Sequence, residues 1–407
     1  TSGLLRAATF GRGVWEININ PEQKIYAGGH LKLNSDANGL NINSDIVVAA
    51  NDILSISNSC TIKMAAGKKI IIENGGQIDI STGAAVTFTS QSGSWEGIEF
   101  QGAAFGTLKN CTFSNTNNPV VIDGGLMLTL NPPAIVIDDC HFTDGTVEIT
   151  NRPGVTIKHS DWTINSGSHT DAILGSGSSG IYIWNNEITY NSQVSGSHGI
   201  QLSQCNDATI TQNTVTNADY PITISNATTY VRYSNITTSY ASTSYEGIYL
   251  NGVNNGHLIG NGVSGYQTGY YLNYYSSPVM LSNLAYGSNS NGNKTALYCF
   301  GSSPRMYPAI NGSEITWDAG LNILRNDAGE SIGIYMEEDS EPGLDYGYNS
   351  IYGATNIYGT YPYLKWEVRC NSWENDPPVF TVYTPEIEYY PFDCTPPDSR
   401  PGKQKDL

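Results

Sequence analysis

Four residues that can move protons stand at the start of similar short apolar segments: Asp171, His198, Tyr220 and Glu246. If these segments lie on successive turns of a coil, the strand spacing brings Asp171 and His198 to about 5 Å from each other. An Asp–His couple can serve as a base and its orienting partner. Asp171 and Glu246 would lie three turns apart, roughly 14 Å, which exceeds the roughly 5 to 9.5 Å that separates paired glycosidase carboxyls. The sequence favours the alternative, in which the row consists of turn residues that cap the strands.

A second group contains Asp138 and Asp139, with His141 after them and Lys158 and His159 one repeat later. Carboxylates beside cations suit Ca²⁺-assisted elimination from uronates, because metal and cations neutralise the substrate carboxylate. Asp139, however, falls inside a repeated phrase, which favours a structural role. A surface Ca²⁺ without catalysis is the intermediate interpretation. No cofactor is certain, and Ca²⁺ at Asp138 and Asp139 is the one candidate.

A third group is a row of tyrosines, Tyr249, Tyr271 and Tyr298, which Tyr335 continues. Each is flanked by apolar residues that must face the core, so the tyrosines are expected to face outward. Aromatic rings present flat apolar faces with a hydroxyl, and pyranose rings offer matching C–H faces. The row therefore predicts a surface that binds an extended sugar chain, with Tyr274 at its edge beside Tyr275. The alternative is that the segment 300–345 folds over the row and buries it.

The elements that position these groups follow from an internal repeat. Between Leu108 and Tyr286 one phrase occurs eight times, and its closing residues are 20 to 29 residues apart. A second family of strands lies between the copies with the same period, and no sustained 3.6-residue apolar period occurs. A shared period of this length indicates a solenoid in which each repeat is one turn. The expected inner ladder is structural and reads Cys111, Cys140, Ser160, Asn186, Asn213, Ser234, Asn261 and Asn283.

Composition excludes several classes of partner. Charged residues make up only 14% of the 407 residues, and the formal net charge is −18. This balance argues against nucleic acid, whose phosphates require Lys and Arg, and against anionic membranes. The sequence contains no run of 18 apolar residues, so it predicts no membrane-spanning helix. The seven cysteines contain no C-x-x-C pair; Cys370 and Cys394 are the candidate disulfide, and Cys111 and Cys140 could equally be stacked free thiols.

Several phrases resemble a known family. The stretch 67–80 with Trp95–Phe100, the repeated phrase itself, and Tyr363 to Pro378 followed by Val382 to Pro385 are similar to secreted right-handed parallel β-helix proteins of the pectate-lyase-like fold. The particular resemblance is to Bacteroidota proteins exported by the type IX route. It covers about 40–390 and implies an all-β solenoid of roughly a dozen turns, located outside the cell or on its surface.

The resemblance also suggests a domain organisation. Leu4 to Ile17 resembles the closing strand of extracellular β-propellers, so residues 1–20 are interpreted as the remnant of a preceding domain. Residues 21–376 are then the β-helix, with an insertion at about 300–345, and 377–407 an extended wrap and linker. This arrangement implies a piece of a larger multidomain chain.

The expected function is to engage a polysaccharide or cell-surface glycan along Tyr249, Tyr271, Tyr298 and Tyr335. Because this fold hosts several activities, two alternatives stay open. One is a polysaccharide lyase or glycoside hydrolase that uses Asp171, His198 and Glu246. The other is a non-catalytic adhesin or stalk segment.

Overall fold

The computed structural model describes residues 4–8, 14–18, 24–33, 39–81, 83–125, 132–165, 171–239, 245–287, 295–307, 309–311, 314–316, 320–326, 332–338, 340–344, 349–359, 365–368, 371–373, 378–382 and 386–388. The chain forms two units, Thr1–Thr209 and Ile210–Leu407, called here the N-terminal and the C-terminal unit. The described residues of both units form strands and turns, with no helix among them. None of them therefore belongs to a helix able to cross a membrane.

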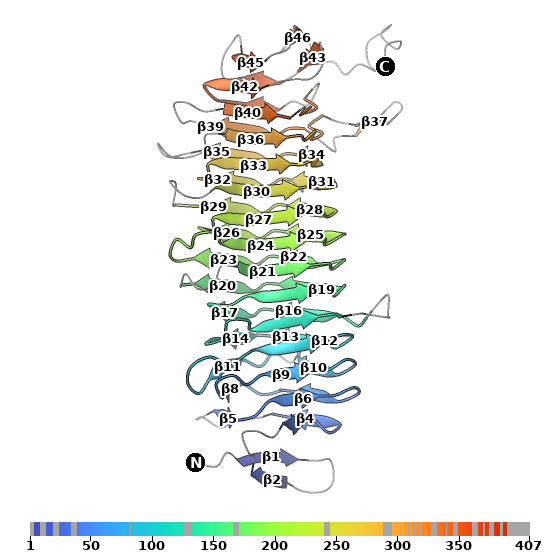
Figure 1. Cartoon of the computed structure of the whole chain (residues 1–407), viewed down its shortest axis with the longest axis vertical. Helices are drawn as coiled ribbons and strands as arrows, with labels where there is room; N and C mark the ends of the chain where they lie inside the picture. Colours follow the sequence, from blue (N-terminus) through green and yellow to red (C-terminus); the bar gives the residue numbers. More distant parts are fainter. Residues whose placement is uncertain are drawn as a thin grey trace. The chain divides into compact units, whose positions relative to one another are not determined.

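The N-terminal unit is a coil of three parallel sheets, called sheets 1, 2 and 3. Within each sheet a strand pairs in parallel with its equivalent on the next turn, as Ile46, Ile70 and Ile98 do in sheet 1 (Figure 1). Sheet 1 contains β3 (Ile25–Tyr26), β6 (Ile46–Val48), β9 (Ile70–Ile72), β12 (Ile98–Gln101), β15 (Val120–Asp123), β18 (Val147–Thr150), β21 (Asp171–Ser176) and β24 (His198–Ser203). Sheet 2 contains β4 (His30–Lys32), β7 (Ile53–Ser55), β10 (Gln77–Ile80), β13 (Phe105–Lys109), β16 (Ile135–Asp138), β19 (Val155–Lys158) and β22 (Tyr182–Trp184). Sheet 3 contains β5 (Leu40–Ile42), β8 (Cys60–Met64), β11 (Val86–Ser90), β14 (Cys111–Phe113), β17 (His141–Thr143), β20 (Asp161–Ile164) and β23 (Glu187–Tyr190).

The C-terminal unit repeats this plan. Its sheet 1 contains β27 (Tyr220–Ser225), β30 (Glu246–Asn251), β33 (Thr268–Asn273), β36 (Thr295–Phe300), β40 (Ile332–Glu337), β42 (Thr355–Gly359) and β45 (Phe380–Val382). Its sheet 2 contains β28 (Thr229–Arg232), β31 (Asn254–Ile259) and β34 (Ser277–Leu281). Its sheet 3 contains β26 (Thr214–Thr216), β29 (Asn235–Thr237), β32 (Gly262–Ser264), β35 (Leu284–Gly287), β39 (Ile323–Asn326), β41 (Ser350–Ile351) and β44 (Ser372–Trp373). The predicted all-β parallel β-helix is confirmed.

Three short pairs complete the strands, and β25 (Ala208–Thr211) lies at the boundary of the two units. β1 (Leu4–Ala8) and β2 (Val14–Asn18) form an antiparallel pair, as do β37 (Ala309–Asn311) and β38 (Glu314–Thr316). β43 (Lys365–Glu367) pairs in parallel with β46 (Glu386–Glu388). The antiparallel β1–β2 pair differs from the coil, but it does not by itself identify a preceding domain.

The core is made of ladders of like residues, because parallel in-register pairing places equivalent side chains one above another. In sheet 3 of the N-terminal unit the rings of Phe88, Phe113, Phe142 and Trp162 are stacked with centroid distances of 5.3, 5.1 and 4.5 Å. All four side chains are buried, and burial of each aromatic side chain contributes roughly 1.5–3 kcal/mol. These ladders hold the polar turns in place.

The predicted polar ladder is structural. In the C-terminal unit Asn261 donates its side-chain amide to Asn283, at 3.0 Å, and Asn283 donates to Asn322, at 2.9 Å. The ladder continues beyond the predicted positions, through Asn349 to Asn371. Each amide also bonds a backbone carbonyl, as Asn283 does with Leu258 at 2.7 Å. The buried amides therefore satisfy the carbonyls at the bend between sheets 2 and 3.

The residue before each ladder position from Cys111 to Asn322 has a left-handed backbone, which makes the bend. Asp139 and His159 have φ values of 57° and 51°, immediately before Cys140 and Ser160. The five cysteines that the structure describes are free thiols. The candidate pair Cys370 and Cys394 lies outside the described residues.

Candidate functional site

The predicted tyrosine row lies on the outer side of sheet 1 in the C-terminal unit. Tyr249, Tyr271, Tyr298 and Tyr335 are direct register partners on β30, β33, β36 and β40, and Tyr358 on β42 continues them (Figure 1). We call these five residues the tyrosine ladder. Their neighbours along each strand are buried, so the alternation of the strand turns the tyrosines outward, as predicted.

The rings of the ladder stack on one another, so the surface that they offer to a ligand differs from the predicted one. Tyr298 lies parallel to Tyr335, with centroids 4.8 Å apart and 7° between planes, and Tyr335 lies parallel to Tyr358 at 5.0 Å and 20°. Tyr271 meets Tyr298 edge to face at 4.6 Å, and Tyr249 is tilted by 40° to Tyr271 at 5.3 Å. Because neighbouring rings cover most of the faces, the ladder presents ring edges and hydroxyls. The expectation that the ladder offers flat faces to a sugar was wrong in this respect.

The hydroxyls of the ladder are organised by two polar residues. Tyr298 and Tyr335 donate hydrogen bonds to the two oxygens of Glu337, at 2.5 and 2.7 Å. Asn273 donates its amide to the hydroxyl of Tyr249 at 2.8 Å. The bond to the Glu337 carboxylate raises the pKa of Tyr335 to about 12, and burial with the same carboxylate raises the pKa of Tyr298 further. The phenols therefore stay protonated and can accept hydrogen bonds from a ligand.

Two largely exposed aromatic side chains occur at the edge of the ladder. Tyr274 and Tyr275 follow β33 and are 58% and 75% exposed. Both have positive φ, 42° and 59°, an uncommon conformation for a bulky residue that is found at functional sites. Tyr274 packs edge to face against Phe300 at 5.7 Å. This pair, at the edge in the sequence prediction, offers the flat surface that the ladder itself lacks.

Glu246 lies at the opposite edge of the ladder, at the start of β30. Its Oε2 atom is inaccessible to solvent and has no hydrogen-bond partner among the described residues. Burial raises the pKa of Glu246 to about 7. Tyr220 and Tyr245 stack in parallel beside it, with centroids 5.3 Å apart. Burial, reinforced by the Glu246 charge, raises the pKa values of Tyr220 and Tyr271 to about 12 each.

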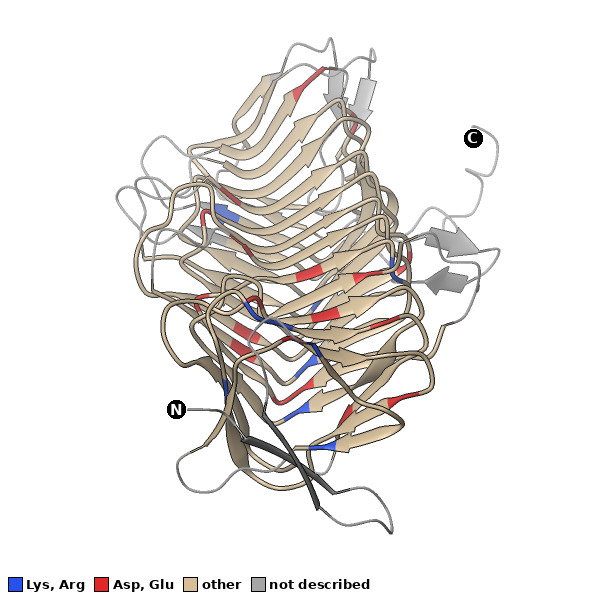
Figure 2. Ribbon diagram, turned by 60° about the horizontal axis from the view of Figure 1, so that its bottom comes forward, with Lys and Arg blue, Asp and Glu red and all other residues tan. Residues whose placement is uncertain are grey.

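The charged residues on the strands of this face are all acidic. The strands β27, β30, β33, β36, β40 and β42 contain Glu246 and Glu337 but no Lys or Arg. Charged residues are sparse along the coil, where most of the ribbon is uncharged (Figure 2). The tyrosine face is therefore hydroxyl-rich, aromatic and weakly acidic.

Asp171 and His198, predicted to be neighbours, are in contact in the N-terminal unit. They begin β21 and β24 as register partners, and His198 Nδ1 lies 2.8 Å from Asp171 Oδ1. Both side chains are about one-fifth exposed. Tyr190 is buried beneath them and donates its hydroxyl to the backbone carbonyl of His198 at 2.7 Å. The geometry matches a couple of base and orienter, whereas the third predicted member, Glu246, belongs to the C-terminal unit.

The predicted Ca²⁺ ligands have other partners. Asp138 Oδ1 bonds His159 Nδ1 at 2.8 Å, and its Oδ2 lies 3.7 and 3.6 Å from the amines of Lys109 and Lys158. Burial opposes ionisation of Asp138, but the hydrogen bond with His159 and the charges of Lys158 and Lys109 outweigh it and lower its pKa. Asp139 is an exposed bend residue, and no group of three or more His, Cys, Asp or Glu among the described residues could hold a metal. Asp138 is therefore a structural ion pair, and the geometry does not favour Ca²⁺ there.

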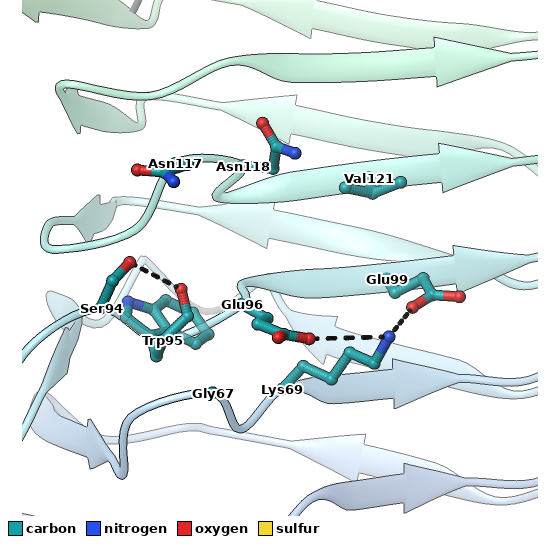
Figure 3. Close-up of a pocket in the computed structure, with 9 residues that line it drawn as sticks. All are labelled: Gly67, Lys69, Ser94, Trp95, Glu96, Glu99, Asn117, Asn118 and Val121. Carbon is teal, nitrogen blue, oxygen red and sulfur yellow. Dashed lines mark hydrogen bonds and ion pairs between the residues drawn. The ribbon is translucent and has the colours of Figure 1, made fainter. Parts of the chain in front are cut away.

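A pocket that the sequence reasoning missed lies over sheet 1 of the N-terminal unit (Figure 3). Its volume is about 470 Å³, and Lys69, Glu96 and Glu99 line it. The Lys69 amine bonds Glu99 at 2.6 Å and lies 4.0 Å from Glu96. The bond to Glu99 raises the pKa of Lys69, and although burial opposes it, hydrogen bonds from Gln101 and Lys69 lower the pKa of Glu99. The pocket thus contains a closed ion pair rather than a free acid and base.

Apart from the antiparallel pair β37–β38, the described residues of the segment 300–345 follow the coil. Arg305 bridges Val279 of β34 on one side and Gly343 on the other, in parallel. β39 pairs with β35, and β40 pairs with β36. These parts extend the sheets and contribute Tyr335 to the ladder.

Comparison with known proteins agrees with this fold. Residues 171–332 match the family model of the right handed beta helix region. Two solved structures, a double and a single mutant of the periplasmic alginate epimerase AlgG, are similar with TM-scores of 0.51 and 0.50. Both are 13% identical and cover 90% of this chain, with 84% and 85% of their own chains covered. No match was found among curated proteins. The chain is therefore a right-handed parallel β-helix, and the comparisons show the fold alone.

Proposed function

We propose that the C-terminal unit binds a polysaccharide at the tyrosine face, which comprises the tyrosine ladder with Tyr274 and Tyr275. The observation that carries the proposal is the ladder itself, a continuous column of hydroxyls beside two exposed rings in a strained turn. Sugars require such a combination, since they offer hydroxyls at their rims and apolar C–H faces. The ladder advances by one tyrosine per strand spacing, about 4.8 Å, comparable to the advance of one sugar residue in an extended glycan.

The setting of this function is part of the proposal. An extracellular or cell-surface location and export by the type IX route rest on the phrases at 67–80, 95–100 and 363–385, and membership of a larger multidomain chain rests on the resemblance of Leu4 to Ile17 to a β-propeller strand. Alginate, the substrate named for the AlgG structures, indicates that this fold can handle polysaccharides. It does not select a glycan for this chain, since likeness at 13% identity concerns the fold.

The test measures how strongly a glycan is retained by a double variant of the tyrosine face and by a single variant that serves as its control. Tyr274→Ala with Tyr275→Ala removes the exposed rings and is expected to weaken retention by about tenfold to hundredfold, at roughly 0.5–1.5 kcal/mol per ring contact. Tyr233→Ala is the control, because Tyr233 is 61% exposed and has a positive φ of 51° but follows β28 in sheet 2. Equal losses in both variants would contradict a site at the tyrosine face.

The same incubation separates the alternatives. Reducing ends or absorbance from unsaturated uronates would indicate a hydrolase or lyase, with Asp171, His198 and Glu246 as the residues to change next. Retention without products supports the binding module. Absence of both signals across plant, algal and amino-sugar polysaccharides would leave the adhesin or stalk segment.

A further inference from the structure

We propose that Glu246 and the tyrosines around it form a subsite for an organic ammonium group, so that the glycan bound by the tyrosine face carries free amino groups. The inference rests on the proposed function and names its substrate class. It concerns one edge of the tyrosine face and commits to an amino-sugar polymer as the ligand.

The Glu246 carboxyl has an oxygen without a hydrogen-bond partner among the described residues. Glu246 is half-buried: this oxygen, Oε2, is shielded from solvent, so a ligand would contact the carboxylate at its other oxygen. A carboxylate in such a position is unfavourable unless a cation or donor reaches it. The adjacent strands β27 and β33 contribute no Lys or Arg. Among the described residues these strands supply no cation, and we infer that a ligand supplies it.

The second argument is the aromatic surroundings. The Glu246 charge acts on Tyr220 of β27 and on Tyr271 of β33, one on each side of β30. Two tyrosines of its own segment contact these rings. Tyr245 stacks on Tyr220 with centroids 5.3 Å apart, and Tyr249 is tilted by 40° to Tyr271 at the same centroid distance. Tyrosine rings attract organic cations through their negative faces, and sites for substituted ammonium groups combine several such rings. A carboxylate among four tyrosines fits an ammonium better than a neutral hydroxyl.

The third argument is the charge around the site. Asp219, directly before β27, and Glu337, on β40, are the other carboxylates near these tyrosines, and both act on them. The formal net charge of the chain is −18. Such a field repels polyuronates and attracts a polycation. This balance distinguishes an amino-sugar polymer from an acidic one.

The experiment compares two oligomers of equal length, glucosamine and N-acetylglucosamine, by titration calorimetry. Acetylation removes the ammonium charge, and it is expected to weaken binding about tenfold to hundredfold through loss of a charge-assisted contact. Glu246→Gln keeps the shape and removes the charge, so the variant should bind both oligomers with nearly equal affinity. Glu338→Gln is the control, since Glu338 is an exposed carboxylate of the same unit, and it should keep the preference.

A pH series adds a readout that a structural role for Glu246 would not produce. N-trimethylated glucosamine oligomers have a charge that does not change with pH. Because the pKa of Glu246 is about 7, its ionised fraction and therefore their affinity should rise about tenfold from pH 6 to pH 8. The rise should be absent in Glu246→Gln.

The outcomes separate the inference from the function on which it rests. If both oligomers bind equally well to the unchanged protein, the ammonium subsite is wrong and the glycan-binding face stands. A preference that survives Glu246→Gln overturns the subsite as well. If neither oligomer nor any other glycan is retained, the proposed function fails and the inference fails with it.

Discussion

We predict a measurable effect of the Glu246→Gln substitution on stability, and its measurement requires no ligand. A carboxyl buried without a partner penalises the folded state once it ionises. Burial raises the pKa of Glu246 from 4.5 to about 7. Below pH 4.5 the carboxyl is protonated in both states and has no effect. As the pH rises to 7 the unfolded chain releases the proton while the folded chain retains it, so stability falls over this range.

The size of the effect follows from linkage. Between pH 5 and pH 8 the full shift corresponds to a loss of about 2.5 kcal/mol, which partial solvent exposure reduces to about 2 kcal/mol. Each coil of a solenoid contacts its neighbours, so the loss should concentrate around β30. Hydrogen exchange of peptides covering β27, β30 and β33 reports the local opening free energy. We expect it to fall from pH 5 to pH 8 in the unchanged protein and to stay nearly constant in Glu246→Gln.

Glu338→Gln is again the control, because an exposed carboxylate has no such penalty. The reasoning is refuted if the opening free energy around β30 shows the same pH dependence with and without Glu246. It is also refuted if stability rises with pH in this range, since that is the sign for a carboxylate stabilised by the fold.

Two further predictions concern the scaffold. Asn283→Ala removes a buried amide that donates to Leu258 and Asn322 and accepts from Asn261. The Leu258 carbonyl and the Asn261 amide each lose a partner, whereas Asn322 Oδ1 keeps the backbone N–H of residue 283. The substitution should lower the free energy of unfolding by about 1–3 kcal/mol per lost partner, measured by urea denaturation. A decrease no larger than that of the surface variant Tyr233→Ala would contradict a structural ladder. Asp138→Asn should lower the free energy of unfolding by about 1 kcal/mol at neutral pH. Because the folded state lowers the pKa of Asp138, its contribution to stability is present above the unfolded pKa and is lost as the pH falls. The variant should therefore lose less stability on acidification than the unchanged protein, which thermal unfolding at pH 7 and pH 3 measures.

The repeat made the coil predictable from the sequence. The inner ladder was identified at Asn261 and Asn283 because equivalent positions in a parallel coil must stack, and the outward direction of Tyr249 followed from strand alternation. The continuation through Asn322 and Asn349 was not found, since the segment after Phe300 departs from the spacing of the earlier copies. Pairing between distant turns restores the ladder there, and pairing is not visible in local spacing.

The orientation of side chains within the site was less predictable. The outward row of tyrosines was predicted, but the stacking of its rings on one another was not. The degree of stacking depends on χ angles that a pattern of residues does not specify. Similarly, Asp138 and Asp139 were candidates for a metal site because carboxylates stand there beside Lys158, one repeat later. The sequence did not identify Lys109, which comes from the preceding turn and lies near Asp138 only once the coil is formed.

Stacking also explains where binding can occur on this face. A solenoid that repeats tyrosine on each turn satisfies the ring faces internally, so the middle of the ladder contributes hydroxyls and rigidity. Among the residues that the structure describes, exposed rings and a carboxyl oxygen without a hydrogen-bond partner occur at the two edges of this face, at Tyr274 and Tyr275 after β33 and at Glu246 at the start of β30. Two adjacent tyrosines with positive φ and a shielded carboxyl oxygen depart from the usual rules for the ends of strands. Because natural sequences tolerate such departures chiefly at functional sites, the edges of the ladder are where a ligand should be sought.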